Sequence, residues 1–339
     1  MKKNLNQKSI DCFIESLWKI SLALVFYTLL VILWGAWVRI SHSGDGCGDT
    51  WPLCQGQLIP DSELKKTWVE YSHRFTSGLY GILVLALFFW IKKQTFNSLF
   101  QIKRWSFWVL IFMITEALLG AKLVLFKLVN LNDSLWRVIV MSLHQLNSFL
   151  LVGFTVRLLC AALEYKWFPE LSVMSANKKT QRLQNNRYLL MILILAMTGA
   201  WAALSTTLFP SVSLLEGFAK DFATDSHSIL KIRITHPILA VSFGIYMIYY
   251  FANKYSEWKD SVGDSQGLIK YQNLEQIVGR LAKAMAFSVF LAVLIGIITL
   301  LSLSPTSLKL IHLTLAHVLW MLSVSYYHFS SLKKRLNIE

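Results

Sequence analysis

The sequence has 339 residues, a net charge of +14, 55% hydrophobic residues and only 15% charged residues. With a mean hydropathy of +0.49, this composition predicts an all-α integral membrane protein and excludes a water-soluble globular protein. The Lys and Arg residues collect in alternate loops and form no basic stripe with interleaved aromatics, so we expect membrane lipid and no nucleic acid as a partner. The long polar start MKKNLNQKSIDCFIES is not typical of a cleaved signal peptide, and we expect a bacterial cell membrane location.

Eight stretches of about 20 apolar residues predict eight transmembrane helices, because that length crosses a hydrocarbon core about 30 Å thick. An even number of spans puts both termini on one side, and the Lys- and Arg-rich segments identify that side as the cytoplasm. The predicted spans are Leu17–Ile40, Trp68–Ile91, Trp105–Phe126, Leu135–Cys160, Tyr188–Phe209, Ile232–Phe251, Ala284–Leu303 and Leu308–Phe329.

An internal repeat divides the chain into two halves. Three positions recur at offsets of 164, 163 and 168 residues: Gly35 as Gly199, His73 as His236, and His144 as His312. The repeat predicts two pseudo-symmetric four-helix bundles, with one His on the second span and one on the fourth span of each. We assign residues 1–163 to the first half, 164–187 to a cytoplasmic linker and 188–339 to the second half.

Two imidazoles on facing helices of a four-helix bundle suit axial ligation of a b-type haem. Zinc is disfavoured, because no further Cys, His or carboxylate joins the histidines at ligand spacing. His317 competes with His312, but five residues of helix turn their side chains about 140° apart, so they cannot address one iron. We favour His312, which lies nearer the outer face.

The halves differ three residues before the first histidine, where Glu70 stands in one and Arg233 in the other. A carboxylate can accept a proton or stabilise positive charge, whereas an arginine can only donate and anchor an anion. The first site therefore has the residues of a reactive site and the second those of a cofactor site. In the alternative interpretation, Glu70 only forms an ion pair with Arg74, four residues on.

Further candidates lie near the outer face. Cys47 and Cys54 have six residues between them and can close a disulfide that either staples the loop or exchanges electrons. Four arginines either extend to the membrane interface or pair with anionic groups of a ligand, such as propionates. They are Arg39, Arg74, Arg137 and Arg233.

The segment GAWVRISHSGDGCGDTWPLCQGQLIP, followed by EYSHR, resembles the haem A synthase family, found in mitochondria as the cytochrome oxidase assembly protein. The remaining family histidines match His144 in SLHQLNSF, His236 in RITHPILA and His312 in LIHLTLAH, so the resemblance covers all eight spans. It implies an oxidoreductase that oxidises a ring methyl of haem O to the formyl group of haem A for terminal oxidase biogenesis.

The resemblance also implies a role for each site. His73 and His144 would hold the substrate haem, His236 and His312 a haem b cofactor, and Glu70 would be the essential carboxylate. Cys47 and Cys54 match the family's first-loop cysteine pair, but the loop after the fifth span lacks the second pair that some members carry.

The expected partners are haem O synthase and the terminal oxidase assembly machinery, with a homo-oligomer left open. Two alternatives remain. One is a di-haem b-type electron carrier between quinone and outer-face thiols, and the other is a haem-delivery protein without chemistry of its own.

Overall fold

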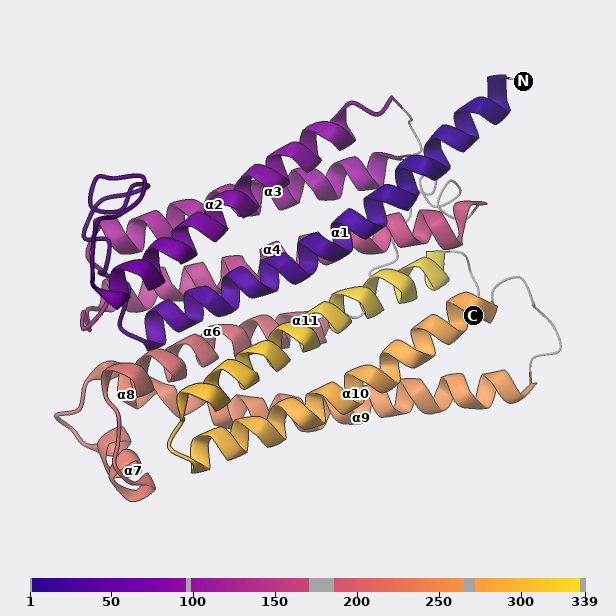
Figure 1. Ribbon diagram of the computed structural model, residues 1–339. Coiled ribbons are helices and arrows are strands. Elements are labelled where there is room, and N and C mark those ends of the chain that lie inside the picture. Colours follow the sequence, from indigo (N-terminus) through magenta and orange to yellow (C-terminus); the bar gives the residue numbers. More distant parts are fainter. Residues whose placement is uncertain (1, 96–98, 171–185, 265–271, 336–339) are drawn as a thin grey trace.

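The computed structural model describes residues 2–95, 99–170, 186–264 and 272–335, and it is built from helices over these ranges (Figure 1). Eight of the helical segments that it describes are long and apolar enough to cross a membrane, which confirms the predicted all-α, multi-pass membrane fold. The long helices are α1 (Lys2–Ile40), α2 (Lys65–Lys92), α3 (Phe100–Leu125), α4 (Leu135–Trp167), α6 (Arg187–Leu208), α9 (Thr235–Asp264), α10 (Gln272–Leu301) and α11 (Thr306–Arg335).

Two short helices, α7 (Leu214–Phe222) and α8 (Ser228–Arg233), follow α6 and were not predicted. They are too short and too polar for a hydropathy pattern to reveal. Helix α8 runs almost directly into α9, and the break falls just before Pro237, which has no N–H with which to continue the helical hydrogen bonds. Arg233 thus ends α8, and His236 lies in the first turn of α9.

The long helices extend beyond the apolar stretches. Helix α1 begins at Lys2 rather than Leu17, and α4 continues to Trp167 rather than ending at Cys160. Hydropathy marks only the part of a helix that meets lipid, whereas the backbone hydrogen bonds continue into water. Glu164, assigned to the start of the linker, lies in the last turns of α4, and linker residues 171–185 lie outside the described residues.

Helices α1 to α4 pack against one another, and so do α6, α9, α10 and α11. The two sets meet along α4, which contacts both α6 and α11. In α4, 67% of the most apolar window is buried inside the protein, against 17–28% in the other spans. Helix α4 is therefore the central helix of the molecule, and its mutation should affect both sets.

Both termini lie at one end of the molecule, and the loop after α1 lies with α7 and α8 at the other end, called the outer end here (Figure 1). This arrangement agrees with an even number of crossings. That the end with the termini faces the cytoplasm, and that the two halves are pseudo-symmetric, stay predictions.

Candidate functional site

The outer loop after α1 is fastened to the start of α2. Gly46 lies so close to this turn that a Cβ there would be 2.4 Å from the carbonyl oxygen of Lys66, so a side chain does not fit. Thr67 adds a hydrogen bond of 2.9 Å from its hydroxyl to the Gly46 oxygen. The loop that follows is therefore held directly over α2.

Cys47 and Cys54 form a disulfide, which confirms the predicted pairing. Both residues are buried, with 0% and 2% of their surface exposed. The backbone N–H of Cys47 donates to Oε2 of Glu70 at 2.8 Å. The disulfide loop and the candidate catalytic carboxylate are thus joined by a direct hydrogen bond.

The ion pair between Glu70 and Arg74 is present and buried. Nη2 and Nε of Arg74 donate to Oε1 of Glu70 at 2.6 and 3.1 Å, and Glu70 is only 2% exposed. Nη1 of Arg74 donates to the carbonyl oxygens of Thr50 and Leu53, both at 2.6 Å. Because a buried carboxylate needs a partner of opposite charge, this pair makes the burial of Glu70 tolerable and ties the loop to α2.

His73 of α2 packs directly on Gly35 of α1, where an added Cβ would lie 2.9 Å from Cε1 of the imidazole. His144 of α4 faces Gly120 of α3 in the same way, at 3.8 Å. His73 and His144 thus both lie in the first set of helices, on α2 and α4, each facing a glycine of a neighbouring helix.

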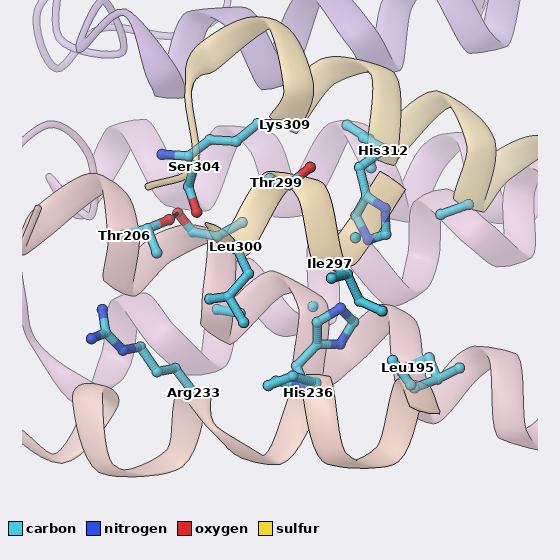
Figure 2. A pocket seen from close by; sticks show the side chains of 18 of the residues that line it. Leu195, Thr206, Arg233, His236, Ile297, Thr299, Leu300, Ser304, Lys309 and His312 are labelled. Atoms are coloured by element: carbon cyan, nitrogen blue, oxygen red, sulfur yellow. Dashed lines mark hydrogen bonds between the residues drawn. The ribbon is translucent and has the colours of Figure 1, made fainter. Parts of the chain in front are cut away.

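The same kind of contact recurs in the second set. A Cβ on Gly199 of α6 would lie 3.1 Å from the ring of His236, and one on Gly296 of α10 would lie 3.0 Å from the ring of His312. Figure 2 shows the two imidazoles pointing toward one another from facing helices. Their ring centroids are 6.2 Å apart, and the ring planes make an angle of 76°.

This spacing suits a metal ion between the rings. A transition metal binds an imidazole nitrogen at about 2 Å, so two rings on opposite sides of one ion have centroids about 6 Å apart. Nδ1 of His236 lies 3.1 Å from the hydroxyl of Thr198, which leaves Nε2 for the ion. Over the described ranges, no three His, Cys, Asp or Glu side chains converge as a metal site. The residues present thus fit an iron held by two axial imidazoles better than a site made only of protein ligands.

A cavity of about 330 Å³ surrounds His236 and His312. Its walls carry many small side chains, among them Ala196, Ala200 and Ala203 at helical spacing on α6, which leave room for a flat ligand. Arg233 and Lys309 lie on the same side of the histidine pair (Figure 2). The cavity is thus apolar around the imidazoles and cationic at one end, as a macrocycle with carboxylate substituents requires.

The structure also separates the two candidate histidines of α11. His312 lines the cavity, whereas His317 is not among the residues that line it. His317 is fully buried against Phe149 of α4, with ring centroids 4.3 Å apart, and its Nδ1 lies 3.0 Å from the carbonyl oxygen of Leu313.

The four candidate arginines have different surroundings. Arg74 binds Glu70 and the loop, and Nη1 of Arg137 donates to the backbone oxygens of Asn130 and Asn132. Arg233 donates from Nε to Asp221 at 2.6 Å. These three are therefore already paired with protein oxygens.

Arg39 is placed differently. It comes from α1, yet it lines the cavity of the second set of helices, and its buried Nε has no hydrogen-bond partner among the described residues. Lys309, one of the basic residues that the sequence places near the outer ends of the spans, lines the same cavity. The most available cations around this cavity are thus Arg39 and Lys309, contributed by different halves of the chain.

Glu116 of α3 is a second carboxylate that sequence reasoning missed. Its Oε1 lies 3.4 Å from Nδ1 of His144, and its Oε2 accepts a hydrogen bond of 2.6 Å from Asn147. The signal was available, because an ionisable residue inside an apolar span is costly and marks a functional site by default.

A comparison with protein families decides the relationship of this chain. Residues 18–324 match the family described as cytochrome oxidase assembly protein. The chain belongs to that family.

Individual relatives of this family member carry two names. The chain is 32% identical to a protoheme IX farnesyltransferase of Thermus thermophilus over 308 residues, which are 88% of this chain and 46% of that protein. It is 39% identical to the haem A synthase of Symbiobacterium thermophilum over 145 residues, 43% of this chain and 44% of that protein. With the haem A synthase of Alkalihalophilus pseudofirmus it shares 45% identity over 98 residues, 29% of this chain and 33% of that protein. The chain thus spans less than half the length of each of these relatives.

Proposed function

We propose that this membrane protein is a haem A synthase, which oxidises a ring methyl of haem O to the formyl group of haem A for terminal oxidase biogenesis. One observation carries the proposal. Each set of helices carries two imidazoles, each facing a glycine of a neighbouring helix, and the first set adds Glu116 beside His144 and Glu70 three residues before His73. Membership of the cytochrome oxidase assembly protein family and relatives named haem A synthase support it.

In this proposal the first set is the substrate site and the second is the cofactor site. His73 and His144 would hold haem O, and His236 and His312 would hold haem b, whose carboxylate groups Arg39 and Lys309 would neutralise. Haem b, when bound, supplies one-electron redox chemistry next to the substrate site. The apolar walls of the cavity exclude water, and the glycines fix the direction of each imidazole.

Glu70 takes up a proton or stabilises positive charge at the substrate methyl group. In the structure Oε1 is paired with Arg74, and Oε2 accepts from Cys47. Each oxygen of a carboxylate has two lone pairs. Oε1 accepts two N–H groups of Arg74 and Oε2 accepts one from Cys47, so one lone pair remains on Oε2 for the substrate. The disulfide loop keeps this carboxylate away from water, where its charge has the strongest effect.

The proposal extends to location and partners. The protein resides in the cell membrane with both termini in the cytoplasm, and it receives haem O from a haem O synthase. The relative named protoheme IX farnesyltransferase supports that supply route, because 88% of this chain aligns with part of it.

The test is conversion of haem O in the purified protein from cells that also make haem O. Pyridine haemochrome spectra and mass analysis should find haem O, hydroxylated haem and haem A in the unaltered protein, whereas haem b alone would support an electron carrier instead. Glu70→Gln should abolish conversion while retaining haem. Conversion at the normal rate by this variant would remove Glu70 from the mechanism.

A further inference from the structure

The first set of helices has a second carboxylate, Glu116, which lies beside His144 rather than beside the disulfide loop as Glu70 does. Glu116 lies in the apolar helix α3, and its side chain is 21% exposed. Oε1 lies 3.4 Å from Nδ1 of His144. A histidine that binds a metal through one nitrogen usually donates its other N–H to a carboxylate, a carbonyl or water, and that partner sets the orientation and basicity of the ring.

Polar neighbours hold Glu116 in place. Oε2 accepts from Nδ2 of Asn147 at 2.6 Å, and Oε1 accepts from the hydroxyl of Ser148. Asn147 is fixed in turn by Thr115, whose hydroxyl donates to Oδ1 at 2.7 Å. A carboxylate has about four acceptor positions, so both contacts leave room for one more donor. Nδ1 of His144 is the nearest such donor, because it is buried, has no hydrogen-bond partner among the described residues and lies 3.4 Å from Oε1.

The second set of helices lacks this carboxylate. Glu116 stands four residues before Gly120, the glycine that faces His144. Four residues before Gly296, the glycine that faces His312, stands Ala292. Nδ1 of His236 lies 3.1 Å from the hydroxyl of Thr198, a neutral group. Among the described residues, the carboxylate within 4 Å of a candidate iron ligand is thus Glu116, at the proposed substrate site.

We propose that Glu116 is a positioning residue that accepts a hydrogen bond from Nδ1 of His144 and so makes His144 the most electron-donating of the four axial histidines. This inference rests on the proposed function, because it takes His144 as a ligand of the substrate haem. The carboxylate draws the proton of Nδ1–H toward itself, which raises electron density at Nε2. A more basic histidine ligand would stabilise the ferric state and so lower the reduction potential of a haem held at the first site.

The experiment measures the reduction potential of each haem by optical titration, in the full-length protein purified with haem O and haem b. Glu116→Gln keeps the size but removes the charge and replaces one acceptor oxygen by an NH2 donor. It should shift the first-site potential to more positive values and leave the second-site potential unchanged. Glu116→Asp, which keeps the charge, should give a first-site potential closer to that of the unaltered protein than Glu116→Gln does.

Two control variants distinguish electronic from structural effects. Thr115→Val breaks the support of Asn147 but keeps the charge of Glu116 beside His144. It should shift the first-site potential much less than Glu116→Gln does and leave the second-site potential unchanged. Thr198→Val should move only the second-site potential. A first-site shift in Thr115→Val as large as that in Glu116→Gln would overturn the proposal, because the effect would then come from packing.

The outcomes also separate this inference from the proposed function. If His144→Ala removes axial coordination of the first-site haem and Glu116→Gln leaves its potential unchanged, only the role of Glu116 is overturned. If His144→Ala leaves the coordination of both haems intact, the assignment of His144 as a ligand fails, and the inference fails with it.

Discussion

In both halves, the residue three positions before the first histidine holds an outer segment in place. It is Glu70 in the first half and Arg233, of opposite charge, in the second. Glu70 accepts from the backbone of Cys47 and pairs with Arg74, which ties the disulfide loop to α2. Arg233 pairs with Asp221 and donates to the carbonyl oxygen of Gly217 at 3.1 Å, which ties α7 to the end of α8, just before α9. The comparison teaches that this position fastens an outer segment over each histidine pair, so the chemistry of Glu70 must be tested separately from its structural role.

The outer segments themselves differ. The first is closed by a disulfide whose two residues are buried, and the second is a short helix held by one ion pair. Thiol exchange requires an approach to sulfur, so a partner thiol reaches Cys47 or Cys54 only after the loop opens. The burial favours a staple over rapid electron exchange.

Replacing single histidines tests most directly whether each half of the protein binds its own haem. His73→Ala and His144→Ala should each remove axial coordination from the first-site haem, and His236→Ala and His312→Ala from the second-site haem. Because each half has its own pair, we expect loss of about half the bound haem in each variant. Pyridine haemochrome content and optical spectra provide the measurement.

The matched control is His227→Asn. His227 caps α8 by accepting from the N–H of Ile229 at 3.3 Å, and Asn serves equally well at such a position. It should keep full haem content. Full axial coordination in all four alanine variants would contradict the paired-ligand arrangement.

The glycines that face the histidines give a second test. Gly35→Ala places a Cβ 2.9 Å from His73, and Gly199→Ala places one 3.1 Å from His236, so each imidazole must shift. Overpacking costs roughly 1–3 kcal/mol, which corresponds to about a tenfold or larger loss of haem affinity at that site alone. Haem titration of the purified variants measures this effect.

Gly78→Ala is the control for this series, because no atom lies within 4 Å of a Cβ placed there. It should bind haem normally at both sites. An equal loss of haem affinity at both sites in Gly35→Ala would show that the two sites do not bind haem independently.

The sequence predicts the eight crossings and the histidine pairs because their signals are local. Apolar length determines a span, and a repeated glycine and histidine mark equivalent helices. The facing glycines Gly120 and Gly296 could not be found in this way, since a glycine acquires its role only when another helix packs against it. For the same reason the sequence could not show that Arg39 of the first half lines the cavity of the second.

Replacing Arg74, which holds the disulfide loop at the outer end, should have a smaller effect than the changes above. Arg74→Gln removes the ion pair to Glu70 and weakens two hydrogen bonds to the loop. The loop should open more often, so the Cys47–Cys54 disulfide should be reduced several-fold faster by dithiothreitol, measured by maleimide labelling. Arg233→Gln, which loosens only α7, should leave this rate unchanged. Equal rates in both variants and the unaltered protein would show that Arg74 does not hold the loop.

The smallest expected effect comes from the exposed pairs. Lys127 lies 3.1 Å from Asp49 and joins two outer loops of the first half, and it holds the pKa of the Asp49 carboxyl below its ordinary value. A carboxyl with a lowered pKa stabilises the folded state above its ordinary pKa of about 4, and this contribution is lost as the pH falls through the lowered value. Exposed pairs are weak, so Lys127→Ala should lower the melting temperature by about 1 °C or less at pH 7.

The matched variant in the second half is Lys220→Ala. Lys220 lies 2.6 Å from Glu216 within α7 and lowers the pKa of that carboxyl in the same way. For both variants, the difference in melting temperature from the unaltered protein should shrink as the pH is lowered below about 4, because protonation of the carboxyl removes its attraction to lysine. Only Lys127→Ala should also speed reduction of the disulfide, since Asp49 belongs to the loop between Cys47 and Cys54 and Glu216 does not. A melting difference that grows at low pH would show that these lysines act through something other than the carboxylates.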